Sequence, residues 1–359
     1  MRVGLRLLLV LILTSLAHAQ VEHVIQISVD GLAGKLLQKY LAEAPAEYSS
    51  FTRLFSEGAG TLNARTDFTH TVTLPNHTSM LTGRPVSPPA GKSSTVAHNY
   101  TLNSDPPDGV TLHSINSQIP YMSSTLDVAH DHGKSTAFYA SKSKFSLFTE
   151  SYSAERGAPA PAGRAKVDHQ CLMETPGDPE TPKVATSLQM HKQLMADLPA
   201  YHPGYTFIHF RDPDSAGHIL GWDSPAYRKA VHNVDTQLGQ LLTLLDTDPQ
   251  FKGKTVIVLT ADHGGVPNTE TKTPKTHSFS TDANNYTIPF VVWGAGVKHG
   301  DLYELNTATR ANPGDKQLDF NAPKQPIRNG EAGNLALKLL GLPAIPGSMI
   351  NASQDLATH

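Results

Sequence analysis

The sequence predicts an α/β fold, a three-layer α/β/α sandwich with a largely parallel central sheet, from two observations. Short runs rich in β-branched and apolar residues recur along the chain and are typical of buried strands. Amphipathic helical patterns lie between several of these runs. Alternation of this kind favours a sheet that is covered by helices on both faces.

The first predicted strand, residues 24–29, is a compact β-branched run that ends at Asp30. Open α/β sheets gather their catalytic groups at the carboxyl ends of strands, so Asp30 is a candidate site residue. A simple Asp-Gly turn is the alternative. Further strands are predicted at 136–140, 205–210, 255–260 and 288–293, with a shorter strand-like stretch at 68–72.

Helices are predicted from periodicity and from their end signals. Between Ala226 and Leu245 the apolar residues recur at spacings of three and four, which indicates one buried stripe. A second helix includes Leu335 to Leu340 and is closed by Gly341. Pro75 would open a third helix, and Gly83 would close it.

The chain divides into a leader and one domain. Residues 1–19 are typical of an export signal, and their apolar run is too short to span a bilayer. A retained membrane anchor is the alternative. Residues 20–359 are predicted to form a single catalytic domain, with long loops near 84–118 and 150–182 that line the site. We therefore expect a periplasmic or secreted protein, with no membrane contact after signal cleavage.

Composition argues against two classes of protein. The formal net charge is -3 with no block of like charges, which is unlike a nucleic-acid-binding surface. The single cysteine, Cys171, cannot form an intramolecular disulfide, and no nucleophile motif surrounds it. An exported fold of this composition must depend on its core and on bound metal.

Asp214 and His218 are candidate metal ligands. They are four residues apart, so on one helical turn they would face the same way and share one cation. The pair follows the predicted strand 205–210. A chance pair is the alternative, because the chain contains 18 histidines.

Asp262 and His263 follow the predicted strand 255–260, and the two glycines after them permit a sharp turn that would direct both side chains to one site. A turn that only reverses the chain is the alternative. With Asp30 and the pair Asp214 and His218, strand ends would supply both oxygen and nitrogen ligands. That mixture suits zinc best and manganese less well.

Thr73 lies between the stretch 68–72 and the helix that Pro75 would open. A hydroxyl there faces the positive end of a helix dipole, and a metal would hold it as the alkoxide. Such a nucleophile needs no histidine base. An ordinary N-cap threonine is the alternative.

Taken in order, these residues resemble the alkaline phosphatase superfamily, most closely its nucleotide pyrophosphatase/phosphodiesterase branch. The matching positions are Asp30, Thr73-x-Pro75-Asn76-His77, Asn99, Asp214-x-x-x-His218, Asp262-His263 and a later histidine. The resemblance extends over about 22–350 and implies an α/β/α sandwich that holds two zinc ions.

The resemblance also implies the roles of these residues. One zinc ion would be held by Asp214, His218 and a third histidine, and the other by Asp30, Asp262, His263 and Thr73. His277 is preferred as the third histidine, because it precedes the strand 288–293 at the distance that the family usually shows. His299 is the weaker candidate. Asn99 would correspond to the asparagine that binds a phosphoryl oxygen.

The implied activity is that of a phosphodiesterase or nucleotide pyrophosphatase acting on a small phosphate ester. Thr73 would attack phosphorus to form a phospho-threonine, which water hydrolyses with overall retention of configuration. Leu74 and His209 stand where nucleotide-hydrolysing members often have Phe and Tyr. Both departures weaken the expectation of a nucleotide substrate.

Other functions share part of this pattern. A phosphomonoesterase would use the same metals with an arginine clamp, for which Arg84 or Arg211 is available. A sulfatase needs an aldehyde made from Cys or Ser, which Thr73 cannot provide. A non-catalytic protein that binds phosphate compounds would need no threonine nucleophile. The physiological substrate and the oligomeric state stay open.

Overall fold

The computed structural model describes residues 21–173, 183–267 and 276–359. The predicted signal, 1–19, lies outside these residues, as does the end of the predicted 150–182 loop. Within the part that is described, no helix is both long enough and apolar enough to cross a bilayer.

An eight-stranded sheet in the order β4-β3-β5-β1-β6-β7-β2-β8 forms the middle layer. Strand β7 pairs antiparallel with β6 and with β2, and the other strand pairs are parallel. The largely parallel sheet is thus confirmed. The strands are β1 (His23–Val29), β2 (Ala59–Arg65), β3 (Thr136–Ala140), β4 (His169–Leu172), β5 (Tyr205–Phe210), β6 (Thr255–Thr260), β7 (Thr287–Gly294) and β8 (Gly300–Asp301).

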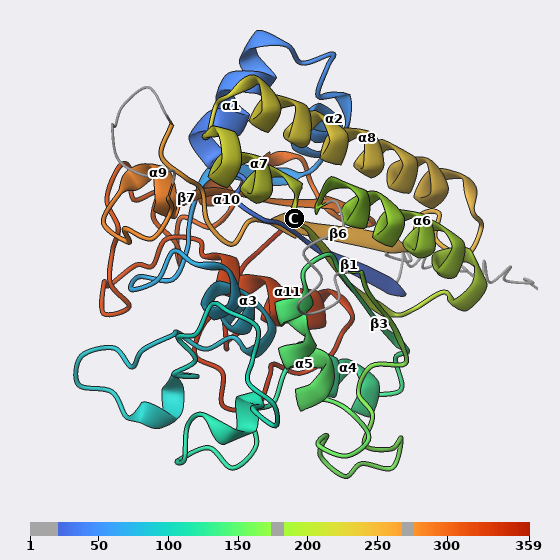
Figure 1. Cartoon of the computed structure of the whole chain (residues 1–359), viewed down its shortest axis with the longest axis vertical. Coiled ribbons are helices and arrows are strands. Elements are labelled where there is room, and N and C mark those ends of the chain that lie inside the picture. Colours follow the sequence, from blue (N-terminus) through green and yellow to red (C-terminus); the bar gives the residue numbers. More distant parts are fainter. Residues whose placement is uncertain (1–20, 174–182, 268–275) are drawn as a thin grey trace, which may run out of the picture.

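Helices cover both faces of this sheet (Figure 1). One face carries α1 (Gly34–Glu43), α2 (Ser49–Glu57), α6 (Lys183–Tyr201), α7 (Asp212–Leu220) and α8 (Pro225–Thr247). The other carries α3 (Thr73–Thr82), α4 (Thr125–Asp131), α5 (Ser146–Ser151) and α11 (Ala332–Leu339). Shorter helical segments are η1 (Ser94–Val96), η2 (Leu112–Ser114), η3 (Ser143–Phe145), α9 (Ala283–Tyr286), α10 (Leu302–Leu305) and η4 (Asn329–Glu331).

The central strands are apolar because both of their faces are covered. Every residue of β1, β5 and β6 is buried. A strand in this position needs no polar face, so its sequence is a nearly continuous apolar run. These runs were therefore recognisable without the structure.

Two local predictions are wrong. The stretch 68–72 is irregular, because the Asp67 carboxylate accepts a hydrogen bond from the Thr69 amide and turns the chain there. The predicted 150–182 loop contains the short strand β4, which pairs with β3. Its residues His169 and Gln170 are partly or largely exposed, so this edge strand has no apolar alternation to reveal it.

Candidate active site

Three neighbouring strands bring the predicted acidic residues together. Strand β1 lies between β5 and β6, and all three are parallel, so their carboxyl ends lie at the same edge. Asp30 directly follows β1, Asp214 lies in the first turn of α7 after β5, and Asp262 follows β6. All three side chains are almost fully buried.

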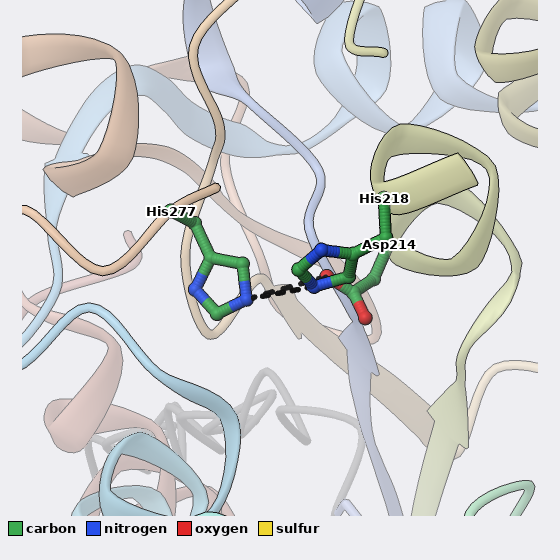
Figure 2. Close-up of side chains that lie close together, drawn as sticks. All are labelled: Asp214, His218 and His277. Atoms are coloured by element: carbon green, nitrogen blue, oxygen red, sulfur yellow. Dashed lines mark hydrogen bonds and ion pairs between the residues drawn. The ribbon is translucent and has the colours of Figure 1, made fainter. Parts of the chain in front are cut away.

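Asp214, His218 and His277 form the first cluster, in which each offers a ligand atom within 4.8 Å of the others. Figure 2 shows His277 approaching the other two side chains from a separate segment of the chain. His277 Nε2 lies 3.1 Å from His218 Nε2. Asp214 Oδ1 lies 3.3 Å from His218 Nε2 and 3.6 Å from His277 Nε2. The three atoms converge on one point, as metal ligands do.

Asp30, Asp262 and His263 form the second cluster, with ligand atoms that also lie within 4.8 Å of one another. His263 Nε2 lies 3.4 Å from Asp30 Oδ1 and 3.3 Å from Asp262 Oδ2. The His263 and His277 rings stack with their centroids 3.5 Å apart, which places the two clusters side by side.

Backbone carbonyl groups fix the protonation of two histidines. His277 Nδ1 lies 2.6 Å from the Thr71 carbonyl oxygen, and His263 Nδ1 lies 2.9 Å from the Gly264 carbonyl oxygen. A carbonyl oxygen only accepts, so each Nδ1 carries the proton and each Nε2 keeps a lone pair. Burial lowers the pKa of His277, and burial together with the neighbouring His277 lowers the pKa of His263 to about 3. Both rings are therefore neutral at pH 7 and suited to metal coordination.

Several ligand atoms lack a hydrogen-bond partner among the described residues. They are Asp30 Oδ1, Asp214 Oδ1, Asp262 Oδ2 and His263 Nε2. Unpaired buried polar atoms are costly, and four of them in adjacent clusters of oxygen and nitrogen donors indicate a common partner. The residues present therefore fit a pair of divalent metal ions.

The remaining carboxylate oxygens are hydrogen-bonded within the protein. Asp262 Oδ1 accepts from the amides of Gly31 and His263. Lys142 Nζ lies 2.6 Å from Asp30 Oδ2 and 2.7 Å from Asp214 Oδ2. Burial acts to raise the pKa of Asp30, but the Lys142 ammonium and His209 outweigh it and hold this pKa well below its usual range.

Thr73 is the first residue of α3, and Val72 is the N-cap without any side-chain cap bond. The N-cap alternative for this threonine is therefore wrong. Thr73 lines a cavity of about 430 Å³ together with the candidate metal ligands Asp214, His218 and His277. His77 Nδ1 contacts the Thr73 carbonyl oxygen at 2.8 Å, rather than the Thr73 hydroxyl that a catalytic base would contact.

The structure brings Asn103, not Asn99, into this cavity. Asn99 donates its amide to Ser94 Oγ, and it is not among the lining residues. Asn103 Oδ1 accepts from the Leu74 amide at 3.0 Å, at the start of α3. The assignment of Asn99 as the oxyanion residue is therefore at odds with the geometry. Both asparagines lie in an aperiodic stretch, where the sequence carries no signal that distinguishes them.

Lys142 was not predicted as part of the site, nor was the contact that His209 makes with Asp30. Lys142 lies two residues beyond the predicted strand β3, so its place at a strand end was a usable signal. His209 Nε2 contacts Asp30 Oδ2 at 2.9 Å, the same oxygen atom that Lys142 contacts. Because β5 places His209 opposite Ser28 of β1, this contact depends on strand register.

The other residues named in the sequence analysis lie in different parts of the structure. Arg211 lines the cavity, whereas Arg84 donates to the carbonyl groups of Thr95 and Pro346. His299 lines a different groove. Leu74 is fully buried in the core. The aromatic side chains of Tyr100, Phe145 and Phe148 are also buried in the core, and Tyr121 is partly buried against it.

Comparison with solved structures defines the fold class. Human ectonucleotide pyrophosphatase/phosphodiesterase 5 is similar with a TM-score of 0.56 and 15% identity, covering 93% of this chain and 99% of that chain. The alkaline phosphatase PafA gives a TM-score of 0.59 and 12% identity, with 94% and 99% covered. Murine ectonucleotide pyrophosphatase/phosphodiesterase 5, as an inactive variant in complex with AMP, gives 0.54 and 14%, with 93% and 99% covered. The fold is thus that of the alkaline phosphatase superfamily.

Another comparison with murine ectonucleotide pyrophosphatase/phosphodiesterase 5, at 19% identity and a TM-score of 0.43, covers 68% of this chain and 57% of that chain. No curated protein matches the sequence. The family model for type I phosphodiesterase/nucleotide pyrophosphatase matches residues 24–88 and 101–338. The chain therefore belongs to the type I phosphodiesterase/nucleotide pyrophosphatase family.

Proposed function

We propose that this protein is a metal-dependent phosphodiesterase with Thr73 as its nucleophile. The observation that carries the proposal is the shared cavity, in which Thr73 lies with the three residues of the first cluster. The second cluster adjoins the first through the stacked rings of His263 and His277. Family membership supports hydrolysis of phosphate esters. Zinc is the preferred ion, because each cluster combines carboxylate and imidazole ligands.

Each part of the site has a defined task in this proposal. Asp214, His218 and His277 would hold one ion, and Asp30, Asp262 and His263 the other, next to Thr73. Bound ions would lower the pKa of the attacking hydroxyl and stabilise the leaving oxygen. Thr73 Oγ1 forms a bond to phosphorus as the bond to the leaving alcohol breaks, and water then hydrolyses the phospho-threonine.

Asn103 would stabilise charge on the transferred phosphoryl group. Its Oδ1 is occupied by the Leu74 amide, so its Nδ2 group is the donor that remains for a ligand in the cavity. A donor of this kind contributes a few kcal/mol to the transition state, on the order of 3 kcal/mol in other enzymes.

A phosphomonoesterase is the second candidate, because three cationic side chains line the cavity: Lys142, Lys144 and Arg211. A phosphate monoester carries more negative charge than a diester, and Lys144 and Arg211 at the cavity wall would bind that charge. None of the described lining residues is Phe, Tyr or Trp, so these residues offer no such ring on which a nucleobase could stack.

The test is to compare the hydrolysis of bis-p-nitrophenyl phosphate and p-nitrophenyl phosphate by the zinc-loaded protein and by Thr73→Ala. Preference for the diester, lost in the variant, supports the proposal. Preference for the monoester would favour the second candidate. An unchanged rate in Thr73→Ala would exclude this nucleophile.

We also propose that residues 1–19 direct export and are then removed. The charge and apolar pattern of this segment support the proposal. N-terminal sequencing of protein recovered from the periplasm or the medium should begin near Gln20. An intact Met1 on an active protein inside the cell would refute it.

A further inference from the structure

We propose that Lys142 is a positioning residue that sets how both metal clusters coordinate, an inference that rests on the metal-dependent hydrolase proposed above. Its ammonium group donates to Asp30 Oδ2 at 2.6 Å and to Asp214 Oδ2 at 2.7 Å. Asp30 belongs to one metal-binding cluster and Asp214 to the other. One protein cation therefore links the two clusters.

The two oxygen atoms of each linked carboxylate have different surroundings. Oδ2 of Asp30 contacts Lys142 and also His209 Nε2 at 2.9 Å. Oδ1 of Asp30 and of Asp214 has no hydrogen-bond partner among the described residues. Instead, Asp30 Oδ1 lies 3.4 Å from His263 Nε2, and Asp214 Oδ1 lies 3.3 Å from His218 Nε2. Each carboxylate thus presents one oxygen to a metal cluster and the other to Lys142.

The residues on either side of Lys142 hold its backbone in place. Ser141 Oγ donates to the His209 carbonyl oxygen at 3.0 Å and accepts from the Arg211 amide at 3.1 Å. Ser143 Oγ donates to Asp105 Oδ1 at 2.6 Å. The Lys142 side chain is only 7% exposed, so its ammonium group has little freedom to leave the two carboxylates.

Removing the ammonium group should release both Oδ2 atoms. The freed Oδ2 atom could then bind the same ion as Oδ1 of that carboxylate. The carboxylate would change from monodentate to bidentate coordination. Four-coordinate sites with three protein ligands and one open position are typical of catalytic zinc. Lys142 would therefore preserve the open position that a substrate needs.

The experiment is cobalt(II) substitution with visible absorption spectroscopy, recorded without substrate. Tetrahedral cobalt(II) absorbs visible light more strongly than cobalt(II) of higher coordination number, so band intensity reports the ligand count. Lys142→Met is compared with wild type and with the control Lys144→Met. Lys144 lines the same cavity, but its Nζ donates to the Asn103 carbonyl oxygen instead of a metal cluster. KM and kcat are measured on the zinc forms.

We expect a loss of visible intensity in Lys142→Met and a wild-type spectrum in Lys144→Met. A wild-type spectrum in Lys142→Met, with only KM raised, would overturn the proposal and make Lys142 a substrate contact. If Lys142→Met does not fold, X-ray absorption of zinc-loaded wild type decides: an average of about four ligand atoms on each zinc ion supports the proposal, and five or more refutes it. None of these spectra requires turnover. A protein that gives the expected spectra but has no activity would therefore refute only the proposed hydrolase function, and not the role of Lys142.

Discussion

In the buried carboxylates of this site, the two oxygen atoms of one side chain have different partners. Asp262 accepts two backbone amides at Oδ1, which leaves Oδ2 for the second metal cluster. Burial and the neighbouring Asp30 raise the pKa of Asp262 well above its ordinary value. A buried group of carboxylates is unfavourable without cations, which is the physical reason to expect bound metal.

The asparagine in the cavity gives the first prediction at this scale. We expect Asn103→Ala to lower kcat/KM for the diester on the order of 10²-fold, because the donor to the phosphoryl group is lost. Steady-state kinetics with bis-p-nitrophenyl phosphate measure the change. The matched control is Asn99→Ala, which removes an amide bonded to Ser94 and should retain most activity. A larger loss in Asn99→Ala would reverse the assignment.

His98 gives a prediction on pH. Its Nδ1 accepts from the Tyr100 amide, and burial lowers its pKa to about 3. Between the ordinary histidine pKa of 6.5 and this lowered pKa, the unfolded chain binds a proton at His98 that the folded protein does not bind. The stability that neutral His98 contributes is therefore fully present above about pH 6.5 and is lost as pH falls toward 3. From pH 7 to pH 5 this group should cost about 2 kcal/mol.

The substitution His98→Asn keeps an acceptor for the Tyr100 amide and removes the titrating ring. Urea unfolding at pH 7 and pH 5 should show a smaller loss of stability in this variant, by about 2 kcal/mol, than in wild type. The control His232→Asn changes an exposed histidine and should behave as wild type. Equal losses in all three proteins would contradict the prediction.

Secondary-structure elements meet closely around the site. Asn329 of η4 donates its amide to Asn76 Oδ1 of α3 and to the carbonyl groups of Ala261 and Asp262. The helix that carries Thr73 and the turn that carries the candidate metal ligands Asp262 and His263 are therefore held by one side chain. The spacing between Thr73 and the second cluster depends on this connection between elements.

The turn after β1 gives a prediction at the scale of elements. Gly31 has a φ of +69°, and a Cβ there would lie 2.8 Å from Asp214 Cα in α7. We expect Gly31→Ala to lower the free energy of unfolding and to reduce bound zinc, because α7 must move. The control Gly91→Ala has a similar φ of +76° with no heavy atom within 4 Å.

Both alanine variants incur the cost of a left-handed backbone, roughly 1–2 kcal/mol. Only Gly31→Ala adds the clash with α7, which should cost about 1–3 kcal/mol more. Urea unfolding and metal analysis after dialysis measure the two effects. Equal destabilisation with full zinc content in both variants would show that α7 adapts freely.

At the scale of the whole molecule, metal binding should contribute to stability. Ions that bind only the folded state add about 2.7 kcal/mol per site at a hundred times Kd. Zinc added to chelator-treated protein should therefore raise Tm by about 5 °C or more. His277→Gln should reduce this rise, whereas His299→Gln, in a separate groove, should keep it. Differential scanning calorimetry is the measurement, and a rise that is equal in all three proteins would argue against a site at His277.

Much of the architecture followed from the sequence, because central parallel strands must be apolar along their whole length. The runs that form β1, β5 and β6 were visible for this reason, and so were the acidic residues at their ends. Asp214 and His218 were paired correctly on one face, since both lie in α7. The sequence by itself therefore determined five strands of the sheet, β1, β3, β5, β6 and β7, and the acidic edge at the ends of three of them.

The tertiary structure decided the contacts made by loops and by strand register. Asn103 rather than Asn99 reaches the cavity, because loop packing has no period that a sequence could display. The link from Lys142 to both metal clusters and the contact of His209 with Asp30 arise between strands that are far apart in the chain. Local sequence encodes where strands and helices form, but only the packed sheet decides which side chains meet at its edge.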